Sequence, residues 1–225
     1  AALLGKRIPV VLSERNDPVR FPSQKYLRAL RLWAYTLCDG LVFQTHQAKS
    51  YFPGFISGKS TVITNPITGK LPARYEGVRE NKIVNYCRLN KQKNLPLLID
   101  AFSDIAEEFP EHSLVIYGDG PEKENLEQRI RERGMTGRIL LPGYCSCIHE
   151  EILKAAMFVS SSDYEGISNS MLEAIALGIP TVCTDCPAGG ARETIRNGVN
   201  GILVMSGETT HEILDKSDDK PDFVL

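Results

Sequence analysis

Two pairs of charged residues could together bind a ligand that carries phosphate groups. Arg88 and Lys93 follow an apolar, strand-like run that ends at Tyr86, and Glu165 and Glu173 flank the start of a predicted helix. An arginine fork and a lysine point charge suit a diphosphate. Two carboxylates suit a ligand that has hydroxyl groups at both ends. Each pair also has an ordinary explanation, which is a solvated charged loop for the first and favourable acidic residues near a helix N-terminus for the second.

The turn before that helix offers a further set of phosphate ligands. A strand ends at Ser160, the Glu165-Gly166 pair makes a turn, and Ser168 or Asn169 can cap the helix that follows. Unpaired N–H groups at a helix N-terminus carry partial positive charge and bind anions. In open parallel sheets, ligands bind beyond the C-terminal ends of the strands. We therefore expect this turn and the arginine-containing loop to face one cleft.

The elements that must position these residues alternate regularly along the chain. The apolar pattern predicts strands at residues 83–86, 114–117, 139–141, 158–160, 180–183 and 202–204. It predicts helices at residues 95–109, 122–133, 147–156, 169–177 and 190–196. Apolar strands separated by helices indicate an α/β fold, with a parallel sheet that is covered on both faces.

A second, shorter block precedes this one. Residues 1–66 contain predicted strands at 8–12, 41–43 and 61–63 and predicted helices at 23–37 and 45–51. The Asn65-Pro66 pair ends the series, because proline disfavours the helical conformation in the residue before it. We interpret residues 67–81 as a linker, residues 82–205 as the second domain and residues 206–225 as a polar, disordered tail.

The predicted helix at 23–37 has an apolar face and several basic residues. That face consists of Tyr26, Leu27, Leu30, Trp33, Ala34 and Leu37. We favour a domain helix that buries one face against its own sheet. The alternative is a helix that lies on an anionic membrane surface, which leaves a peripheral membrane association open.

Charge and hydropathy exclude several classes of protein. The net charge is −2, from 26 basic and 28 acidic residues, so the chain lacks the electrostatic footprint of a nucleic-acid-binding protein. No apolar run approaches the roughly 20 residues that span a bilayer. The first residues do not form a signal peptide, and the chain starts without Met, which we interpret as the start of a fragment.

The six cysteines are scattered, which is typical of a protein from the reducing cytoplasm. Cys145 with Cys147, and Cys183 with Cys186, could supply four thiolates to a zinc ion. The spacing of the first pair is tight for such a site, and Cys183 lies in an apolar run. We therefore favour the interpretation without a metal.

Five segments resemble, in order, the motifs of one enzyme family. Glu165 and Glu173 are separated by seven residues, and this segment resembles the E-x7-E motif of the family 4 (group 1) retaining glycosyltransferases. Residues 88–94 resemble the family's Gly-Arg-Leu-x-x-x-Lys segment, with Cys87 in place of the glycine. Residues 116–122, 141–143 and 185–193 also match. The likeness extends from Ile8 to Val204, and five ordered motifs far exceed chance similarity.

The resemblance implies a GT-B fold, in which two Rossmann-like domains face a cleft. Residues 1–66 would be the C-terminal portion of the acceptor-side domain, without its first strands, and residues 82–205 would be the domain that binds the donor. Glu165 would contact the donor sugar as the catalytic residue. The donor-binding residues would be Arg88 and Lys93 at the diphosphate, Glu173 at the ribose, Tyr144 along the base, and the backbone amides of Gly166, Ile167, Ser168 and Asn169 at phosphate and sugar.

The activity that the resemblance implies is transfer of a hexose from a nucleoside-diphosphate sugar, with UDP as the expected nucleotide, to a polysaccharide or glycolipid acceptor with retention. The family needs no metal, and the sequence contains no Asp-x-Asp. Arg15 stands where many members carry a histidine, which indicates a subgroup that builds polysaccharides. The alternative is a nucleotide-sugar-binding module or a fragment without transferase activity. We expect a cytoplasmic protein, either free or at the inner face of the membrane.

Overall fold

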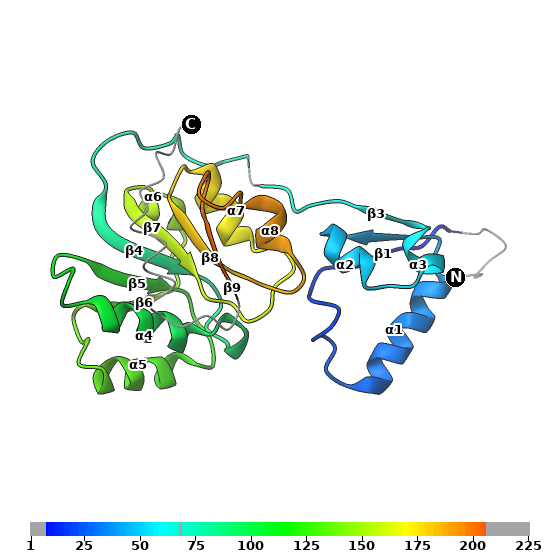
Figure 1. Ribbon diagram of the computed structural model, residues 1–225, viewed down its shortest axis with the longest axis horizontal. Coiled ribbons are helices and arrows are strands. Elements are labelled where there is room, and N and C mark those ends of the chain that lie inside the picture. The colour runs from blue at the N-terminus through cyan, green and yellow to red at the C-terminus, as the bar shows by residue number, and fades with distance from the viewer. Residues whose placement is uncertain (1–7, 68, 206–225) are drawn as a thin grey trace.

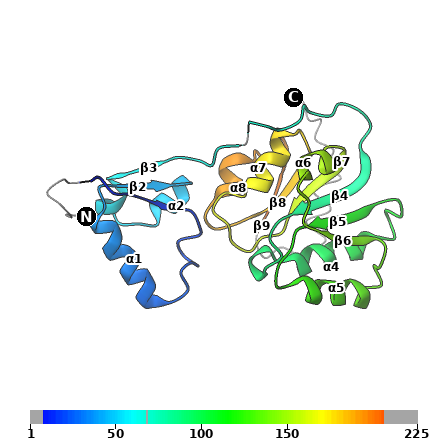
Figure 2. The same cartoon turned by 180° about the vertical axis from the view of Figure 1, so that it is seen from behind.

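Two parallel sheets, each with its own helices, make up the chain (Figure 1). The computed structural model describes residues 8–67 and 69–205, so the predicted tail at 206–225 lies outside the described residues. We call residues 8–66 the N-terminal lobe and residues 80–205 the C-terminal lobe. The segment after the third strand runs from one lobe to the other (Figures 1 and 2).

The N-terminal lobe is a three-stranded parallel sheet in the order β1-β2-β3. Its strands are β1 (Val11–Glu14), β2 (Gly40–Phe43) and β3 (Ser60–Val62). Its helices are α1 (Lys25–Leu37), α2 (His46–Ser50) and α3 (Gly54–Ser57). A small core forms around the buried rings of Tyr35, Phe43 and Phe52.

The C-terminal lobe is a six-stranded parallel sheet in the order β6-β5-β4-β7-β8-β9. Its strands are β4 (Glu80–Tyr86), β5 (Ser113–Tyr117), β6 (Ile139–Gly143), β7 (Ala155–Ser160), β8 (Thr181–Asp185) and β9 (Ile202–Met205). The chain builds outward from β4 to β6 on one side, then returns to the centre with β7 and builds outward to β9 on the other. The strand order therefore reverses between β4 and β7.

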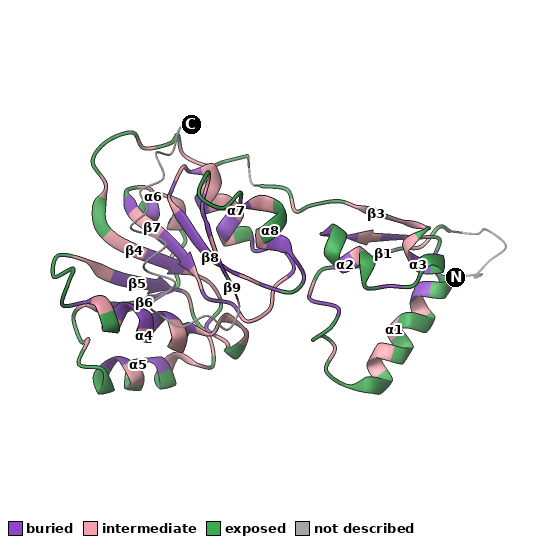
Figure 3. Cartoon of the chain, in the orientation of Figure 1, coloured by how far each residue is buried: buried purple, intermediate pink, exposed green. Residues whose placement is uncertain are grey.

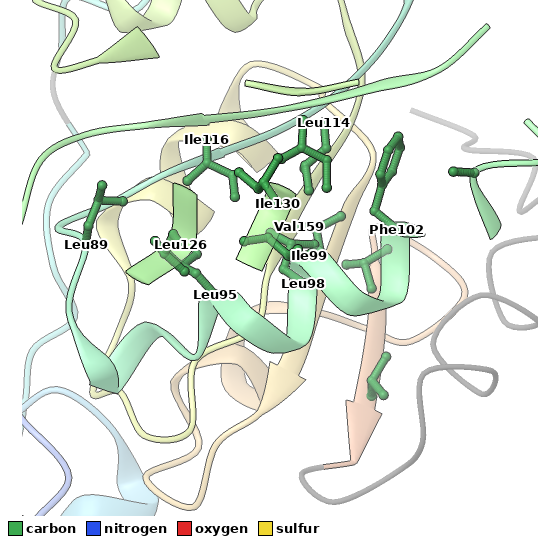
Figure 4. Close-up of a cluster of buried hydrophobic side chains, with 14 of the residues drawn as sticks. Leu89, Leu95, Leu98, Ile99, Phe102, Leu114, Ile116, Leu126, Ile130 and Val159 are labelled. Carbon is green, nitrogen blue, oxygen red and sulfur yellow. The ribbon is translucent and has the colours of Figure 1, made fainter. Parts of the chain in front are cut away.

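Helices cover both faces of this sheet, as the sequence predicts (Figures 1 and 3). They are α4 (Leu95–Ile105), α5 (Lys123–Glu132), α6 (Ile148–Ile152), α7 (Asn169–Ala176) and α8 (Gly190–Thr194), with a short 3-10 turn, η1 (Lys91–Lys93), before α4. One core forms beneath α4 and α5 around Ile99, Phe102 and Leu114 (Figure 4). A second core forms beneath α6 and α7 around Phe158 and Met171.

The expected alternation of strands and helices is confirmed, but several boundaries differ. The helix predicted at 147–156 ends at Ile152, and the strand begins at Ala155, because pairing of Ala155 with Glu80 of β4 outweighs the helix propensity of the alanines. The strand predicted at 8–12 lies at Val11–Glu14, and β4 begins inside the stretch interpreted as a linker. The short elements α3 and η1 were not predicted.

Helix α1 contradicts the prediction that its apolar face is buried. Tyr26 is 70% exposed and Trp33 is 61% exposed, and Leu30 and Leu37 are also exposed. The side that faces the sheet carries Tyr35, the helix's buried residue, together with the half-buried Arg31. The apolar periodicity of α1 therefore predicts the wrong buried face. The face that packs on the sheet is held there by buried polar contacts.

Glu14 accounts for those contacts. Its carboxylate is buried at the end of β1 and accepts hydrogen bonds from Arg31 Nη1 at 3.0 Å and from the Tyr35 hydroxyl at 2.9 Å. A buried carboxylate needs such partners, and they fix the rotation of α1 about its own axis.

Within the described residues, no helix has the length and apolar character needed to cross a bilayer.

The turn after β5 contains glycines because the backbone of the preceding loop passes very close to it. Gly118 has φ +126°, and an ideal Cβ there would lie 1.9 Å from the carbonyl oxygen of Cys87. At Gly120, a Cβ would lie 2.2 Å from the carbonyl oxygen of Leu89. These contacts pin the loop that carries Arg88 against the end of β5. Both glycines are therefore required by this turn.

Gly118→Ala should therefore destabilise the fold more than Gly134→Ala. Gly134 also has positive φ (+68°), but no atom lies within 4 Å of an ideal Cβ there. The control should cost about 1–2 kcal/mol of unfolding free energy, from backbone conformation alone. Gly118→Ala must in addition displace the backbone of Cys87, which adds about 1–3 kcal/mol. Urea denaturation measures both, and equal losses would contradict the close-approach explanation.

Candidate functional site

The predicted site residues other than Tyr144 gather where the strand order reverses, at the C-terminal ends of β4 and β7. The loops after these two strands are joined by several hydrogen bonds. Asn94 Nδ2 donates to Asp163 Oδ1 at 2.8 Å, the Ser161 hydroxyl donates to the Lys93 carbonyl at 2.9 Å, and Asp163 N donates to the Gln92 carbonyl at 3.0 Å. A reversal of strand order leaves a crevice for ligands, and here it carries the charged residues.

Lys93 and Glu165 form an ion pair in this crevice. Lys93 Nζ lies 2.5 Å from Glu165 Oε2, and the two side chains are only 16% and 21% exposed. The Ser162 hydroxyl donates to the same carboxylate oxygen at 3.2 Å. One residue that was predicted to bind phosphate thus holds the one that was predicted to contact the sugar.

Arg88 lies in the same loop as Lys93 and is exposed. Its guanidinium makes no hydrogen bond or ion pair with any residue in ranges 8–67 and 69–205. All of its donors are therefore available to an anionic ligand.

The N-terminus of α7 faces the same region. Ser168 is its N-cap, and the hydroxyl accepts a hydrogen bond from Met171 N at 3.4 Å. The backbone N–H groups of Gly166, Ser168 and Asn169 donate to no acceptor in the part of the chain that the structure describes. Together with the helix dipole, these groups form an anion-binding end of the helix.

Glu173 lies one helical turn further along α7, in a second polar cluster. Its Oε2 atom lies 3.0 Å from the Tyr86 hydroxyl and 2.9 Å from His149 Nε2. Burial first, and the Glu173 carboxylate second, raise the pKa of the Tyr86 phenol, so this hydroxyl keeps its proton. Glu165 and Glu173 are therefore held by different partners.

Tyr144 follows β6 and is 77% exposed. Its backbone N–H donates to Asp119 Oδ2 at 3.1 Å, and the Gly143 carbonyl accepts from Gly118 N at 2.8 Å. These bonds tie the loop to the turn after β5 and leave the Tyr144 ring free to pack against a ligand.

The N-terminal lobe contacts the site directly. The Gln44 side-chain oxygen accepts from Ile167 N at 3.4 Å, and Asn65 Nδ2 donates to Asn169 Oδ1 at 2.7 Å. The guanidinium of Arg15 donates to the side-chain oxygen of Asn65 at 3.1 Å. Each of these three N-terminal-lobe residues follows the end of its strand, so the C-terminal ends of both sheets face one another.

Two further contacts join the lobes beside the site. The Thr45 hydroxyl donates to the Ala188 carbonyl at 2.6 Å. Glu193 on α8 accepts from the backbone N–H of His46 at 2.5 Å, and the His46 ring lies 3.1 Å from its other oxygen. The carboxylate thereby supplies the start of α2 with a negative charge from the opposite lobe.

The cysteines do not gather into one cluster. No three metal-ligating side chains among the described residues lie close enough to share a metal ion. The Sγ atoms of Cys145 and Cys147 lie 3.5 Å apart, whereas Cys183 and Cys186 are buried behind the loop after β7. Burial raises the pKa of the Cys87 thiol to about 12, so this cysteine beside Lys93 and Glu165 stays protonated.

Several partners of the site residues were not foreseen from the sequence. Tyr86 and His149 carry no motif, and they are linked to Glu173 only through the fold. Gln44 and Asn65 lie in the other lobe, more than a hundred residues from Ile167 and Asn169. The one available signal was that Gln44 and Asn65 each follow the end of a predicted strand.

The family model described as "Glycosyl transferases group 1" matches residues 73–219 of the chain. The chain is 34% identical over 123 residues to the poly(glycerol-phosphate) alpha-glucosyltransferase of Bacillus subtilis. The matched residues make up 55% of this chain and 18% of that protein. It is also 30% identical over 163 residues to the lipopolysaccharide 1,6-galactosyltransferase of Escherichia coli. This match covers 69% of this chain and 44% of that protein. The chain spans less than half the length of the curated relatives it matches.

The crystal structure of HepE from Anabaena, in complex with UDP and glucose, superposes with a TM-score of 0.80. The match covers 95% of this chain and 62% of that chain, at 22% sequence identity. This likeness confirms the GT-B fold class that was predicted from the sequence.

Without a ligand, Lys93 and Glu165 should stabilise one another more than an exposed pair does. A double-mutant cycle with Lys93→Met and Glu165→Gln should give a coupling of about 1–3 kcal/mol in urea denaturation, because the two charges are largely shielded from water. The matched control is Lys123 with Asp119, which lie 3.7 Å apart and are 40% and 59% exposed. Lys123→Met with Asp119→Asn should couple by less than about 0.5 kcal/mol. Equal coupling energies for the two pairs would contradict the claim that Lys93 and Glu165 are shielded from water.

Proposed function

Because the chain belongs to the group 1 glycosyl transferases, we propose that it binds a nucleoside-diphosphate sugar and transfers its hexose to a polysaccharide or glycolipid acceptor. The observation that carries the proposal is the group of cations and N–H donors at the strand reversal. Arg88, Lys93 and the N-terminus of α7 all lie beside the carboxylate of Glu165 or in the loops that hold it. Such a site suits a diphosphate that is attached to a hydroxyl-rich group.

Donor binding would rearrange the ion pair in the crevice. The diphosphate offers Lys93 a stronger negative partner than a single carboxylate, and Arg88 can add a bidentate contact. Lys93 would then turn from Glu165 to the phosphates. The released carboxylate, still held by the Ser162 hydroxyl, would accept hydrogen bonds from the hydroxyls of the donor sugar.

Catalysis would depend on stabilising the negative charge of the departing nucleoside diphosphate. As the bond between the anomeric carbon and the phosphate oxygen breaks, charge develops on the diphosphate and the sugar becomes oxocarbenium-like. Fixed cations and a helix N-terminus that point at this charge lower the barrier directly. We propose that they do so without a metal ion and that the anomeric configuration is retained.

The known proteins support the choice of donor and acceptor. HepE was solved with UDP and glucose, so UDP is our first candidate for the nucleotide. The two relatives are named as a glucosyltransferase and a galactosyltransferase, which favours a hexose. Their names also specify a glycerol-phosphate polymer and a lipopolysaccharide, so we propose a polymeric or lipid-linked glycan acceptor. It would approach from the N-terminal lobe, where Arg15 faces Asn65 at the cleft.

We propose a cytoplasmic site of action. All six cysteines are free thiols, and Cys145 and Cys147 lie close together without a bond between them. Reduced cysteines are typical of the cytoplasm.

Thermal denaturation with UDP, GDP, ADP and CMP tests the proposal, each nucleotide being measured with and without EDTA. We expect UDP to raise the melting temperature by several degrees, because a ligand at a hundred times its Kd adds about 2.7 kcal/mol of stability. EDTA should not change the shift. No shift with any diphosphate would contradict the proposed function, and a shift that EDTA abolishes would contradict metal independence.

The same preparation, incubated with UDP-glucose, distinguishes an enzyme from a binding module. Release of UDP on addition of a glycan acceptor would support transfer. If the chain binds UDP but forms no UDP from UDP-glucose, the result would favour the alternative, a nucleotide-sugar-binding module.

Arg88→Ala should weaken UDP much more than uridine, because the arginine is expected to contact the diphosphate. Loss of one charge-assisted contact corresponds to about 1.5–3 kcal/mol, or roughly a 10- to 150-fold rise in Kd. The matched control is Arg131→Ala, which removes an exposed arginine on α5 and should leave both affinities unchanged. Calorimetric titration measures all of these values. An equal loss for nucleoside and nucleotide would show that Arg88 does not bind the phosphates.

A further inference from the structure

We propose that His149 is a positioning residue that orients the Glu173 carboxylate toward the ribose hydroxyls of the bound nucleotide. The inference rests on the proposed function, because it assumes that a nucleotide occupies the crevice beside α7. It adds a residue that lies on a different element, α6, and outside every motif quoted above.

The geometry places two donors on one oxygen atom of Glu173. His149 Nε2 lies 2.9 Å from Oε2, and the Tyr86 hydroxyl lies 3.0 Å from the same atom. The side chains of His149 and Glu173 are 22% and 20% exposed, so water competes only weakly for these bonds. Carboxylate oxygens accept hydrogen bonds, so Nε2 carries the proton.

Of these two donors, only His149 Nε2 has no second acceptor among the described residues. The single proton of the Tyr86 hydroxyl is shared, because this hydroxyl also lies 2.9 Å from the Ser170 carbonyl. His149 Nε2 has Glu173 as its one partner among the described residues. The imidazole therefore holds the carboxylate even when the phenol donates to the helix backbone.

This arrangement leaves the other oxygen of Glu173 for a ligand. Oε1 accepts no hydrogen bond from residues 8–67 or 69–205. A free glutamate side chain loses rotamer entropy when it is ordered, and this loss weakens ligand binding. Because His149 orders Glu173 before the ligand arrives, a pair of ribose hydroxyls meets a carboxylate that is already in place.

The position of His149 also couples two parts of the site. Helix α6 begins four residues after Tyr144, which is expected to pack along the base. Ile148, next to His149, packs against the core beneath α7. The loop that would contact the base is thereby joined to the carboxylate that would contact the ribose.

The test compares the affinities of UDP and 2′,3′-dideoxy-UDP for the full chain and its variants by calorimetric titration. In the unsubstituted chain, loss of the ribose hydroxyls should weaken binding about tenfold or more, because hydrogen bonds to a charged group are lost. His149→Leu should reduce this ratio to about threefold or less, because Glu173 is no longer held toward the ribose. His149→Gln, whose amide can donate from a similar place, should restore most of the ratio, whereas the shorter side chain of His149→Asn should not.

Glu150→Gln is the matched control, since it changes an exposed residue of the same helix and should keep the ratio of the unsubstituted chain. Melting temperatures establish that each variant is folded, and the Gln and Asn variants decide the question if the Leu variant is not. An unchanged ratio in His149→Asn, or no effect of the ribose hydroxyls on the unsubstituted chain, would overturn the inference while UDP binding still stands. No UDP binding by the unsubstituted chain would overturn the proposed function and the inference with it.

Discussion

The site depends on one topological constraint, the reversal of strand order between β4 and β7. The helices that follow β4 and β5 lie on one face of the sheet, and those that follow β6, β7 and β8 lie on the other (Figure 1). At the reversal, the chain therefore leaves β4 and β7 toward opposite faces of the sheet, and a crevice opens between the two loops. The loops at 87–94 and 161–168 face each other across this crevice, and hydrogen bonds from both side-chain and backbone groups hold them together. The same constraint brings Tyr86, the last residue of β4, within reach of α7.

The site satisfies its charges internally. Lys93 neutralises Glu165, and His149 with Tyr86 occupies one oxygen of Glu173, so the carboxylates are ordered although both are only partly hydrated. An unpartnered charge in such a position would lower the stability of the fold, because it would lose its hydration. This cost explains why each of these carboxylates has a nearby partner. Arg88 is the exception, and it can remain unpaired because it is exposed. A polyanion can therefore enter a site that is close to neutral and replace existing pairs.

Much of this arrangement follows from the sequence, and the failures have physical causes. Every strand of the C-terminal sheet was located, because buried parallel strands are continuous apolar runs. The rotation of α1 was predicted wrongly, since the buried Glu14 holds Arg31 against the sheet and leaves Trp33 outside. Motif spacing predicts Glu165 and Glu173 as site residues, but it gives no sign of Lys93, Tyr86 and His149 as their partners. Ser162 is close in sequence, whereas His149 lies 24 residues before Glu173, so no local pattern connects them.

The exposed face of α1 has a spectroscopic consequence. Trp33 is the single tryptophan of the chain, and it lies on the surface of the N-terminal lobe. Its indole emission therefore reports on whatever covers or uncovers that helix and carries no direct signal from the crevice between β4 and β7, where tyrosines such as Tyr86 and Tyr164 lie. Excitation at the red edge, which selects the indole, would follow the environment of α1 alone. The N-terminal lobe can thus be followed by itself in the whole molecule without any added label.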